Sequence, residues 1–419
     1  MALKRQIIPV SDQNLSLGNQ TQGKAPDLDE ELAIISLIES LVERAYTVRA
    51  SDIHFDPEGD RVKVRFRIDG VLQDIRELSK KSHEEVITRI KVLSRLRTDQ
   101  HQTPQDGRFR CLVDEGPIDV RVSIMPTYYG ENAVLRLLAD TEAEFSFANL
   151  GFSPENQQKL VAAIKRPYGM ILVTGPTGSG KTTTLYTIIK QLNSRDTSII
   201  TIEDPIEYSL AGINQIQANP ATGLTFATGL RSILRQDPNI IMVGEIRDSE
   251  TAGLAVNTAL TGHLLLSTLH TNDAATTLPR LLDMGVENYL IASTVNLAIG
   301  QRLVRKICVS CKTAHKLTVA ERKSFEGIFP DEYLAKNAKY FEGKGCEDCS
   351  GTGYKGRIGI QELIVVDNQI REAILKKVAA DEMRRIAIGS GMVPMFEDGL
   401  KKALDGTTTL SEVLRMLHD

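Results

Sequence analysis

The chain has 419 residues, 42% of them apolar, which is enough for two or three domains that each bury a hydrophobic core. Its formal net charge of −4 excludes the polyelectrolyte character that attracts nucleic acid or anionic lipid non-specifically. The N-terminal stretch lacks the apolar region of a signal peptide, and no later stretch reaches about 18 uncharged apolar residues, so we expect a cytosolic protein without membrane spans. Five cysteines in so long a chain do not make a disulfide framework, so grouped cysteines are interpreted first as metal ligands.

The first part of the chain predicts a leader followed by a small domain. Residues 1–27 are rich in Gln, Asn and Ser and poor in large apolar groups, which predicts a disordered leader. From Asp29 onward, Leu and Ile recur at helical spacing behind an acidic start, which predicts an amphipathic helix. Alternating apolar and polar residues after it predict β-strands, and we expect one α+β domain over residues 28–140.

One predicted strand of this domain carries a row of cations. In residues 62–68 the apolar side chains point to one face, whereas Lys63, Arg65 and Arg67 share the other. Like charges side by side are unfavourable unless water or an anion compensates them. The row is therefore either a solvated strand face or a place for an anion. The alternation of IDVRVSIMPT places Arg121 on a polar face as well.

Residues 141–153 predict a linker, because Ser153 and Pro154 then supply an N-cap and a first helical residue. Beyond them, apolar strand runs alternate with helices in the order MILVT, a helix from Lys181, SIITIED, a helix over 226–235, NIIMVGE, a helix over 250–260 and HLLLSTLH. This alternation of near-continuous apolar strands with helices predicts a mostly parallel sheet covered on both faces. We expect an α/β domain over residues 154–419.

The stretch VTGPTGSGKTTTLY contains the phosphate-binding motif G-x-x-x-x-G-K-[ST], between an apolar strand and a helix as the motif requires. Its glycines let backbone N–H groups approach the phosphates, and the helix N-terminus favours the anion. Lys181 reaches the terminal phosphates, and Thr182 is placed to ligate magnesium. We predict that ATP or GTP binds with magnesium, in contact with Gly175, Pro176, Thr177, Gly178, Ser179, Gly180, Lys181, Thr182 and Thr183.

Hydrolysis also needs acidic groups at strand ends beside this loop, to hold magnesium and to orient the attacking water. One apolar strand ends with Glu203 and Asp204 and is followed by Glu207, and another ends with Glu245. A carboxylate at the carboxyl end of a buried strand lies at the usual ligand edge of an open α/β sheet, although acids also cap helices. The two acidic stretches together favour a nucleotide site.

Two histidines, His263 and His270, bracket the last apolar strand seven residues apart. Because side chains alternate along a strand, the two face opposite sides and do not form a simple pair of ligands. Each is either an ordinary structural histidine or a sensor of phosphate.

The cysteine pairs Cys308-x-x-Cys311 and Cys346-x-x-Cys349 supply four thiolates in two knuckles, the ligand set of a closed structural zinc site. The 34 residues between the knuckles exceed the usual spacing, but a helix predicted in VAERKSFEGIF lengthens this excursion without separating the knuckles. We predict a zinc-binding insertion over about residues 305–355. Coincidental cysteines or two disulfides are the alternatives, and the lone Cys111 is expected in a core.

In this order, GPTGSGKTTTLY, TIEDPIEY, IIMVGEIRD and TGHLLLSTLHTNDA resemble the motifs of the secretion ATPases of type II secretion and type IV pilus assembly. ASDIHFDP, RFRIDG, QDGRFR and the cysteine pairs extend the resemblance from about Asp29 to the C-terminus. The resemblance implies a RecA-like ATPase domain with a tetracysteine zinc subdomain, preceded by a PAS-like domain. It also implies a homo-hexamer, cytoplasmic and peripheral at the inner face of the inner membrane, that works on a platform protein.

The resemblance further implies roles for residues at matching motif positions. Lys181 would contact phosphate, Glu207 would be the general base and Glu245 the Walker-B acid. The family's histidine box and the first-domain arginines that reach the nucleotide correspond to His263, His270, Arg67, Arg108 and Arg121. In this family cysteine pairs mark assembly and secretion motors more than retraction motors, which favours extension or secretion.

The leading hypothesis is a motor ATPase that couples ATP hydrolysis to assembly of a pilus or pseudopilus. The alternative is a zinc-containing P-loop ATPase that translocates nucleic acid, which the balanced charge and the lack of an aromatic and basic stripe disfavour. A small-molecule kinase is disfavoured by the order of the motifs. Longer family members carry an additional N-terminal domain for docking, and only the short leader precedes Asp29 here, so the mode of recruitment and the kind of polymer are left open.

Overall fold

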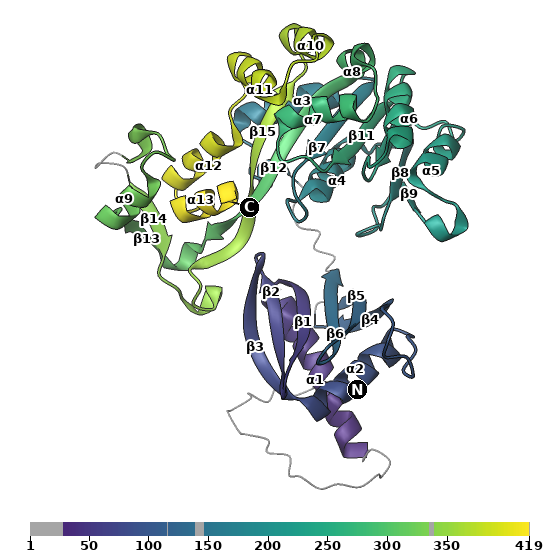
Figure 1. Cartoon of the computed structure of the whole chain (residues 1–419), viewed down its shortest axis with the longest axis vertical. Helices are drawn as coiled ribbons and strands as arrows, with labels where there is room; N and C mark the ends of the chain where they lie inside the picture. Colours follow the sequence, from purple (N-terminus) through teal and green to yellow (C-terminus); the bar gives the residue numbers. More distant parts are fainter. Residues whose placement is uncertain (1–27, 115, 139–145, 335–338, 419) are drawn as a thin grey trace. The chain divides into compact units, whose positions relative to one another are not determined.

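The computed structural model describes residues 28–114, 116–138, 146–334 and 339–418. The predicted leader, residues 1–27, and the first part of the predicted linker, residues 139–145, lie outside the described residues. The chain divides into two compact units, built mainly from residues before and after Leu138 (Figure 1). Within the described residues, no helix has both the length and the apolar character needed to cross a bilayer.

The first unit is a six-stranded sheet with two helices, in the strand order β3-β2-β1-β6-β5-β4 (Figure 1). β1 pairs with β6, and β4 with β5, in antiparallel register. Alternate apolar residues of β2 and β5 are buried, as their sequence pattern predicted. The elements are α1 (Leu28–Thr47), β1 (Ala50–Glu58), β2 (Arg61–Ile68), β3 (Val71–Ser79), α2 (Lys80–Leu93), β4 (Gln105–Val113), β5 (Gly116–Thr127) and β6 (Gly130–Leu138).

The second unit contains a seven-stranded sheet in the order β15-β12-β7-β11-β10-β8-β9 (Figure 1). Neighbouring strands from β12 to β9 are parallel, and only the edge strand β15 runs antiparallel to its neighbour. The prediction of a mostly parallel sheet is confirmed. The strands are β7 (Gly169–Thr174), β8 (Ile199–Glu203), β9 (Asn214–Gln217), β10 (Ile240–Val243), β11 (Leu264–Leu269), β12 (Val295–Ile307) and β15 (Tyr354–Val365).

Helices cover both faces of this sheet, so the central strands are buried on both sides. In β7, Met170 and Leu172 belong to one hydrophobic cluster, whereas Ile171 and Val173 belong to another on the opposite face. The helices are α3 (Pro154–Ile164), α4 (Lys181–Leu192), α5 (Phe226–Ile233), α6 (Ser249–Leu260), α7 (Ala274–Asp283), α8 (Asn288–Thr294), α10 (Asn368–Leu375), α11 (Ala380–Gly389), α12 (Met395–Leu404) and α13 (Leu410–His418), with a short 3-10 turn η1 (Pro220–Thr222).

A separate core holds the insertion between the two cysteine pairs. Phe325 and Phe329 pack with Leu400 of α12, with Val413 of α13 and with Val304 in the C-terminal half of β12. The predicted helix in VAERKSFEGIF is confirmed as a short one. The insertion contains η2 (Val309–Cys311), β13 (Lys312–His315), α9 (Val319–Phe325), η3 (Asp331–Leu334), β14 (Tyr340–Gly343) and η4 (Glu347–Cys349), with β13 and β14 paired antiparallel.

Part of the predicted linker is packed into the second unit. Phe147 and Phe152 are buried in the core cluster beside β7, with their rings edge to face 5.8 Å apart. The Leu150 carbonyl accepts a hydrogen bond from the Gln361 side chain on β15. From Ser146 onward this segment therefore belongs to the fold of the second unit, because its aromatic side chains are buried there.

Candidate nucleotide site and cysteine cluster

The phosphate-binding loop joins β7 to α4 and has a backbone shape that requires glycine. Gly175, Gly178 and Gly180 have φ angles of 144°, 78° and 86°, in the region where other residues are strained. A Cβ atom on Gly175 would lie 2.2 Å from the Gln301 carbonyl oxygen. The loop leads into the first turn of α4, where free N–H groups and the helix dipole favour an anion. The predicted residues from Gly175 to Thr183 are therefore one continuous segment, made of the loop and the first turn of α4.

Lys181 is the first residue of α4, and its side chain folds back over the loop. The Nζ atom donates hydrogen bonds to the carbonyl oxygens of Gly175 (2.8 Å) and Pro176 (3.0 Å). Burial lowers the pKa of Lys181, and the nearby Glu245 carboxylate opposes this shift. A terminal phosphate would give the ammonium an anionic partner in place of two neutral carbonyl groups, so the side chain is well placed for a nucleotide.

Glu245 and His270 follow β10 and β11, so both lie at the carboxyl edge of the parallel sheet, as the loop after β7 does. His270 Nε2 lies 2.7 Å from Glu245 Oε2, and Arg247 Nη2 lies 2.5 Å from Oε1. Burial raises the pKa of Glu245, but the hydrogen bonds from Arg247 and His270 outweigh burial and the net pKa is lowered. Glu245 is therefore ionised at neutral pH and suited to hold the water ligands of magnesium.

The three acids after β8 have different surroundings. Glu203 is buried, and its carboxylate accepts hydrogen bonds from Tyr186, Thr201 (2.6 Å) and Gln215 (3.2 Å). Burial, followed by Glu203, raises the pKa of Tyr186, so its hydroxyl stays protonated as the donor. Glu203 consequently ties α4 to β8, with its oxygens already bound by protein donors.

Asp204 and Glu207 lie on the loop that follows β8. Because β8 is the parallel neighbour of β10, this loop leaves the sheet at the same carboxyl edge as Glu245. Asp204 is exposed, and its charge contributes to raising the pKa of Arg247 after the larger effect of Glu245. Glu207 is half-buried. Both acids are thus on the side of the sheet edge where the phosphate loop lies.

His263 does not reach this edge. It precedes β11, and its backbone carbonyl accepts a hydrogen bond from Gly169 at the start of β7. The length of β11, about 20 Å for a strand of this size, separates it from His270. Its ring Nδ1 lies 3.2 Å from the Thr258 carbonyl oxygen, which fits a structural histidine.

The predicted arginines lie on three strands of the six-stranded sheet. Arg108 and Arg121 are directly opposite each other in the β4–β5 pair, and Arg67 lies on β2, separated from β5 by two strands. The other cations of the β2 row have acidic partners: Lys63 pairs with Glu58 at 3.1 Å and Arg65 with Asp56 at 2.8 Å. The Arg67 guanidinium donates to the Gly70 carbonyl oxygen at 3.2 Å. Carboxylates thus compensate part of the predicted cationic row.

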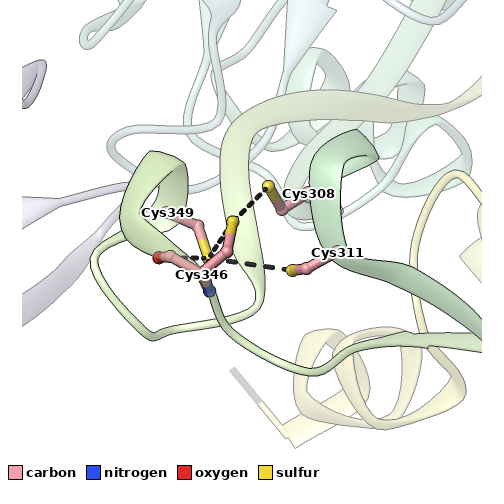
Figure 2. A group of neighbouring side chains, drawn as sticks. All are labelled: Cys308, Cys311, Cys346 and Cys349. Atoms are coloured by element: carbon pink, nitrogen blue, oxygen red, sulfur yellow. Dashed lines mark hydrogen bonds between the residues drawn. The ribbon is translucent and has the colours of Figure 1, made fainter.

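The four cysteines of the two knuckles converge in space (Figure 2). Their Sγ atoms all lie within 4.8 Å of one another. The distance is 3.8 Å for Cys308–Cys346, 3.9 Å for Cys311–Cys349 and 3.7 Å for Cys346–Cys349. Four sulfurs placed tetrahedrally about 2.3 Å from a zinc ion would be about 3.8 Å apart, whereas a disulfide needs about 2.0 Å. The arrangement fits zinc, and the disulfide alternative is wrong for this structure, since all four thiols are free.

Backbone donors also prepare this cluster for a cation. The N–H groups of Cys346 and Gly353 each donate to Cys349 Sγ at 3.2 Å. Burial raises the pKa of Cys349, but these hydrogen bonds and the neighbouring thiols outweigh burial and bring the pKa to about 6. Burial keeps the pKa of Cys311 and of Cys346 above the usual value, so Cys349 is the thiol of the cluster that these donors favour as a thiolate. The thiolate is the form that binds a metal. Cys111, by contrast, lies alone on β4 and is only half-buried instead of fully in the core.

One residue that contacts the phosphate loop was not identified from the sequence. Gln301 on β12 is buried, and its side chain hydrogen-bonds to Ser179 and Thr184. A neutral amide in the run GQRLV matches no motif. Only the pairing of β12 with β7 brings it to the loop.

Comparisons with known proteins show the family of the chain. The family described as "Type II/IV secretion system protein" matches residues 27–415. The type II secretion system protein E of Xanthomonas campestris is 46% identical over 395 residues, which cover 94% of this chain and 69% of that protein. The type IV pilus assembly ATPase PilB of Thermus thermophilus is 46% identical over 388 residues, or 93% of this chain and 43% of that protein.

Solved structures show the same fold. The pilus retraction motor PilT with bound ADP has a TM-score of 0.60 at 26% identity, over 91% of this chain and 97% of that chain. The Legionella pneumophila ATPase DotB has a TM-score of 0.67 at 23% identity, over 91% and 95% of the two chains. The predicted α/β, RecA-like fold is confirmed. With a family match over nearly its whole length and relatives at 46% identity, the chain belongs to the type II secretion and type IV pilus assembly ATPases.

Proposed function

We propose that this chain is a homo-hexameric motor that couples ATP hydrolysis to assembly of a pilus or pseudopilus, through a platform protein at the cytoplasmic face of the inner membrane. One observation carries the proposal. The phosphate loop after β7, Glu245 after β10 and His270 after β11 meet at one edge of a parallel sheet, in a chain of the secretion ATPase family. The tetracysteine cluster supports assembly or secretion over retraction.

In the proposed reaction, the phosphates of ATP lie along the loop and the first turn of α4. The Lys181 ammonium leaves the carbonyls of Gly175 and Pro176 and pairs with the terminal phosphates. Magnesium, when bound with the nucleotide, neutralises phosphate charge, and Thr182 and the waters held by Glu245 would ligate it. His270 keeps the Glu245 carboxylate oriented through its 2.7 Å contact.

We assign Glu207 as the general base that orients the attacking water and takes its proton. Its loop lies at the same sheet edge as Glu245, and its carboxylate is half-buried. Arg67, Arg108 and Arg121 of the six-stranded sheet are proposed to stabilise charge on the terminal phosphate in the transition state, from the same or a neighbouring subunit. A guanidinium is suited to this role because its planar donors match phosphate oxygens.

Phosphate release from MgATP by the purified chain tests the catalytic part of this proposal. Lys181→Ala and Glu207→Gln should each reduce turnover by on the order of a hundredfold or more with the fold retained, as judged by circular dichroism. Glu372→Gln, which removes an exposed carboxylate paired with Lys376 on α10, is the control and should turn over normally. Near-normal turnover in either active-site variant would remove the assignment.

The assembly role needs separate experiments. Mass photometry with MgATP should detect a particle of six times the 46.2 kDa chain mass. Replacing the chromosomal copy by Lys181→Ala in the source organism should abolish either surface pili or export of secreted proteins. Intact pili and intact export in that strain would refute the coupling of hydrolysis to assembly.

A further inference from the structure

β12 continues past the end of β7 at the point where the phosphate loop leaves the sheet. Gly300 is the register partner of Thr174, the last residue of β7, so Gln301 is the first β12 residue beyond the pair. Gln301 is 1% exposed. A buried neutral amide at this position needs an explanation, since its polar atoms must be hydrogen-bonded to be tolerated in a core.

Both ends of the Gln301 amide are used by the phosphate-binding segment. The Nε2 atom donates to the Ser179 carbonyl oxygen at 2.8 Å, and the Thr184 hydroxyl donates to Oε1 at 2.7 Å. Ser179 belongs to the loop, and Thr184 lies one turn into α4 with no exposed surface. The amide therefore bridges the last part of the loop and the start of the helix.

Gln301 also lies against two glycines of the motif. Its carbonyl oxygen would be 2.2 Å from a Cβ atom on Gly175, and its Nε2 would be 2.8 Å from a Cβ atom on Gly180. The first and the last glycine of the loop therefore both pack against Gln301, one against its backbone and the other against its side chain. The absence of side chains at Gly175 and Gly180 is required by Gln301 as well as by the phosphates.

Other side chains do not satisfy these contacts. Leucine has a similar size but would leave the Ser179 carbonyl and the Thr184 hydroxyl buried without their partner. An ionised glutamate accepts but does not donate, so it would place a carboxylate oxygen against the Ser179 carbonyl oxygen. Glutamine is long enough to reach both groups and supplies one donor and one acceptor.

We propose that Gln301 is a positioning residue for the nucleotide: it fixes the shape in which the loop binds the phosphates, without contacting the nucleotide itself. The inference rests on the proposed nucleotide site and adds to it a residue about 120 positions beyond the motif. Free N–H groups bind an anion well only when they are already directed at it, so loss of the bridge weakens phosphate binding.

The chain contains a matched control. Gln361 on β15 lies directly opposite Gln301 in the sheet register and has no exposed surface. Its Nε2 donates to the Leu150 carbonyl oxygen at 2.8 Å, away from the phosphate loop. Gln301→Leu and Gln361→Leu therefore remove the same amide from the same sheet at equal burial. Only the first removes contacts to the loop.

The experiment measures the Kd of a fluorescent N-methylanthraniloyl ADP with magnesium, together with urea unfolding. Both leucine variants should be destabilised, but only Gln301→Leu should raise the Kd, by about tenfold or more, which corresponds to loss of one buried hydrogen bond. Equal Kd values for the two variants, or an unchanged Kd in Gln301→Leu, would overturn the proposal.

Gln301→Glu supplies a second measurement, which stands even if Gln301→Leu does not fold. A protonated carboxyl group can donate to Ser179 and accept from Thr184, as the amide does. Its Kd relative to the wild type should therefore improve as the pH falls toward about 5. A pH-independent ratio would refute the bridging role. A wild-type chain that binds ADP but does not hydrolyse ATP would refute the proposed function and leave the inference on Gln301 intact.

Discussion

Replacing Cys346 with serine is expected to release a structural zinc ion and to unfold the insertion between the two cysteine knuckles. Cys346 Sγ lies 3.8 Å from Cys308 Sγ and 3.7 Å from Cys349 Sγ, so the substitution removes one corner of the tetrahedron. Serine oxygen is a poor replacement, because four thiolates are the ligand set that this geometry fits.

The magnitude follows from what holds this part of the chain. A structural zinc ion contributes on the order of 10 kcal/mol to folding of its site. The net stability of a whole domain is about 5–15 kcal/mol, so loss of the metal is comparable with everything else that stabilises the fold. The effect should begin locally, since the insertion shares its small core of Phe325 and Phe329 with α12 and α13.

Elemental analysis should find about one zinc ion per wild-type chain and none above background in Cys346→Ser. Limited proteolysis should then cut the variant within residues 312–345, and a chelator should reproduce the pattern in the wild type. Cys111→Ser is the control, because this half-buried cysteine on β4 lies outside the cluster. The predicted zinc site would be refuted if the purified wild-type chain contains no zinc and its melting temperature is the same with and without chelator.

Two further substitutions test the arginine assignment and a buried ion pair. Arg67→Ala should lower ATP turnover by on the order of a hundredfold with little change in melting temperature. Arg61→Ala is the control: Arg61 lies on the same face of β2 and pairs with Glu77, and its loss should leave turnover unchanged. If Arg67→Ala changes only the melting temperature, this face of β2 is merely solvated and has no role in turnover. The Glu412 side chain is 2% exposed and pairs with Arg305 at 2.6 Å. Burial raises the pKa of Glu412, but hydrogen bonds from Arg305 and Arg415 outweigh burial and the net pKa is lowered. Its contribution is therefore present above the unfolded pKa of 4.5 and lost as the pH falls through the folded value. Glu412→Gln should lower the free energy of unfolding by about 2 kcal/mol at pH 7, measured by urea unfolding. The difference in unfolding free energy between the variant and the wild type should become smaller as the pH falls toward about 4. A difference that does not change with pH would contradict an ionised Glu412–Arg305 pair.

The sequence predicted those parts of the fold where one physical signal dominates. The strands β7, β8, β10 and β11 are apolar along their whole length because helices cover both faces, and their continuous apolar runs made them recognisable. The phosphate loop was recognisable because its glycines and Lys181 have no substitute in that role. Glu245 followed from its place at a strand end.

The remaining features depend on pairing between distant segments. β12 and β15 form a long antiparallel pair, but their sequences are interrupted by the cysteine insertion, so no local pattern predicts the pairing. Gln301 reaches the phosphate loop through another long-range contact, the pairing of β12 with β7. In the predicted linker, Phe147 and Phe152 are buried in the core, whereas the N-cap at Ser153 indicates only where the next helix begins.

The cysteine cluster lies where the β12–β15 ladder ends. Ile307 is the register partner of Tyr354, and the Cys308 N–H donates to the Gly353 carbonyl oxygen at the next step. Because strand side chains alternate between faces, a slip of one residue along this ladder would turn the buried side chains of β15 to the opposite face of the sheet. A metal ion bound by both knuckles would clamp the two strand ends together and prevent that slip, whatever the length of chain between the knuckles. Insertions or deletions in the excursion from β13 to β14 should therefore leave the register of the β12–β15 pair undisturbed.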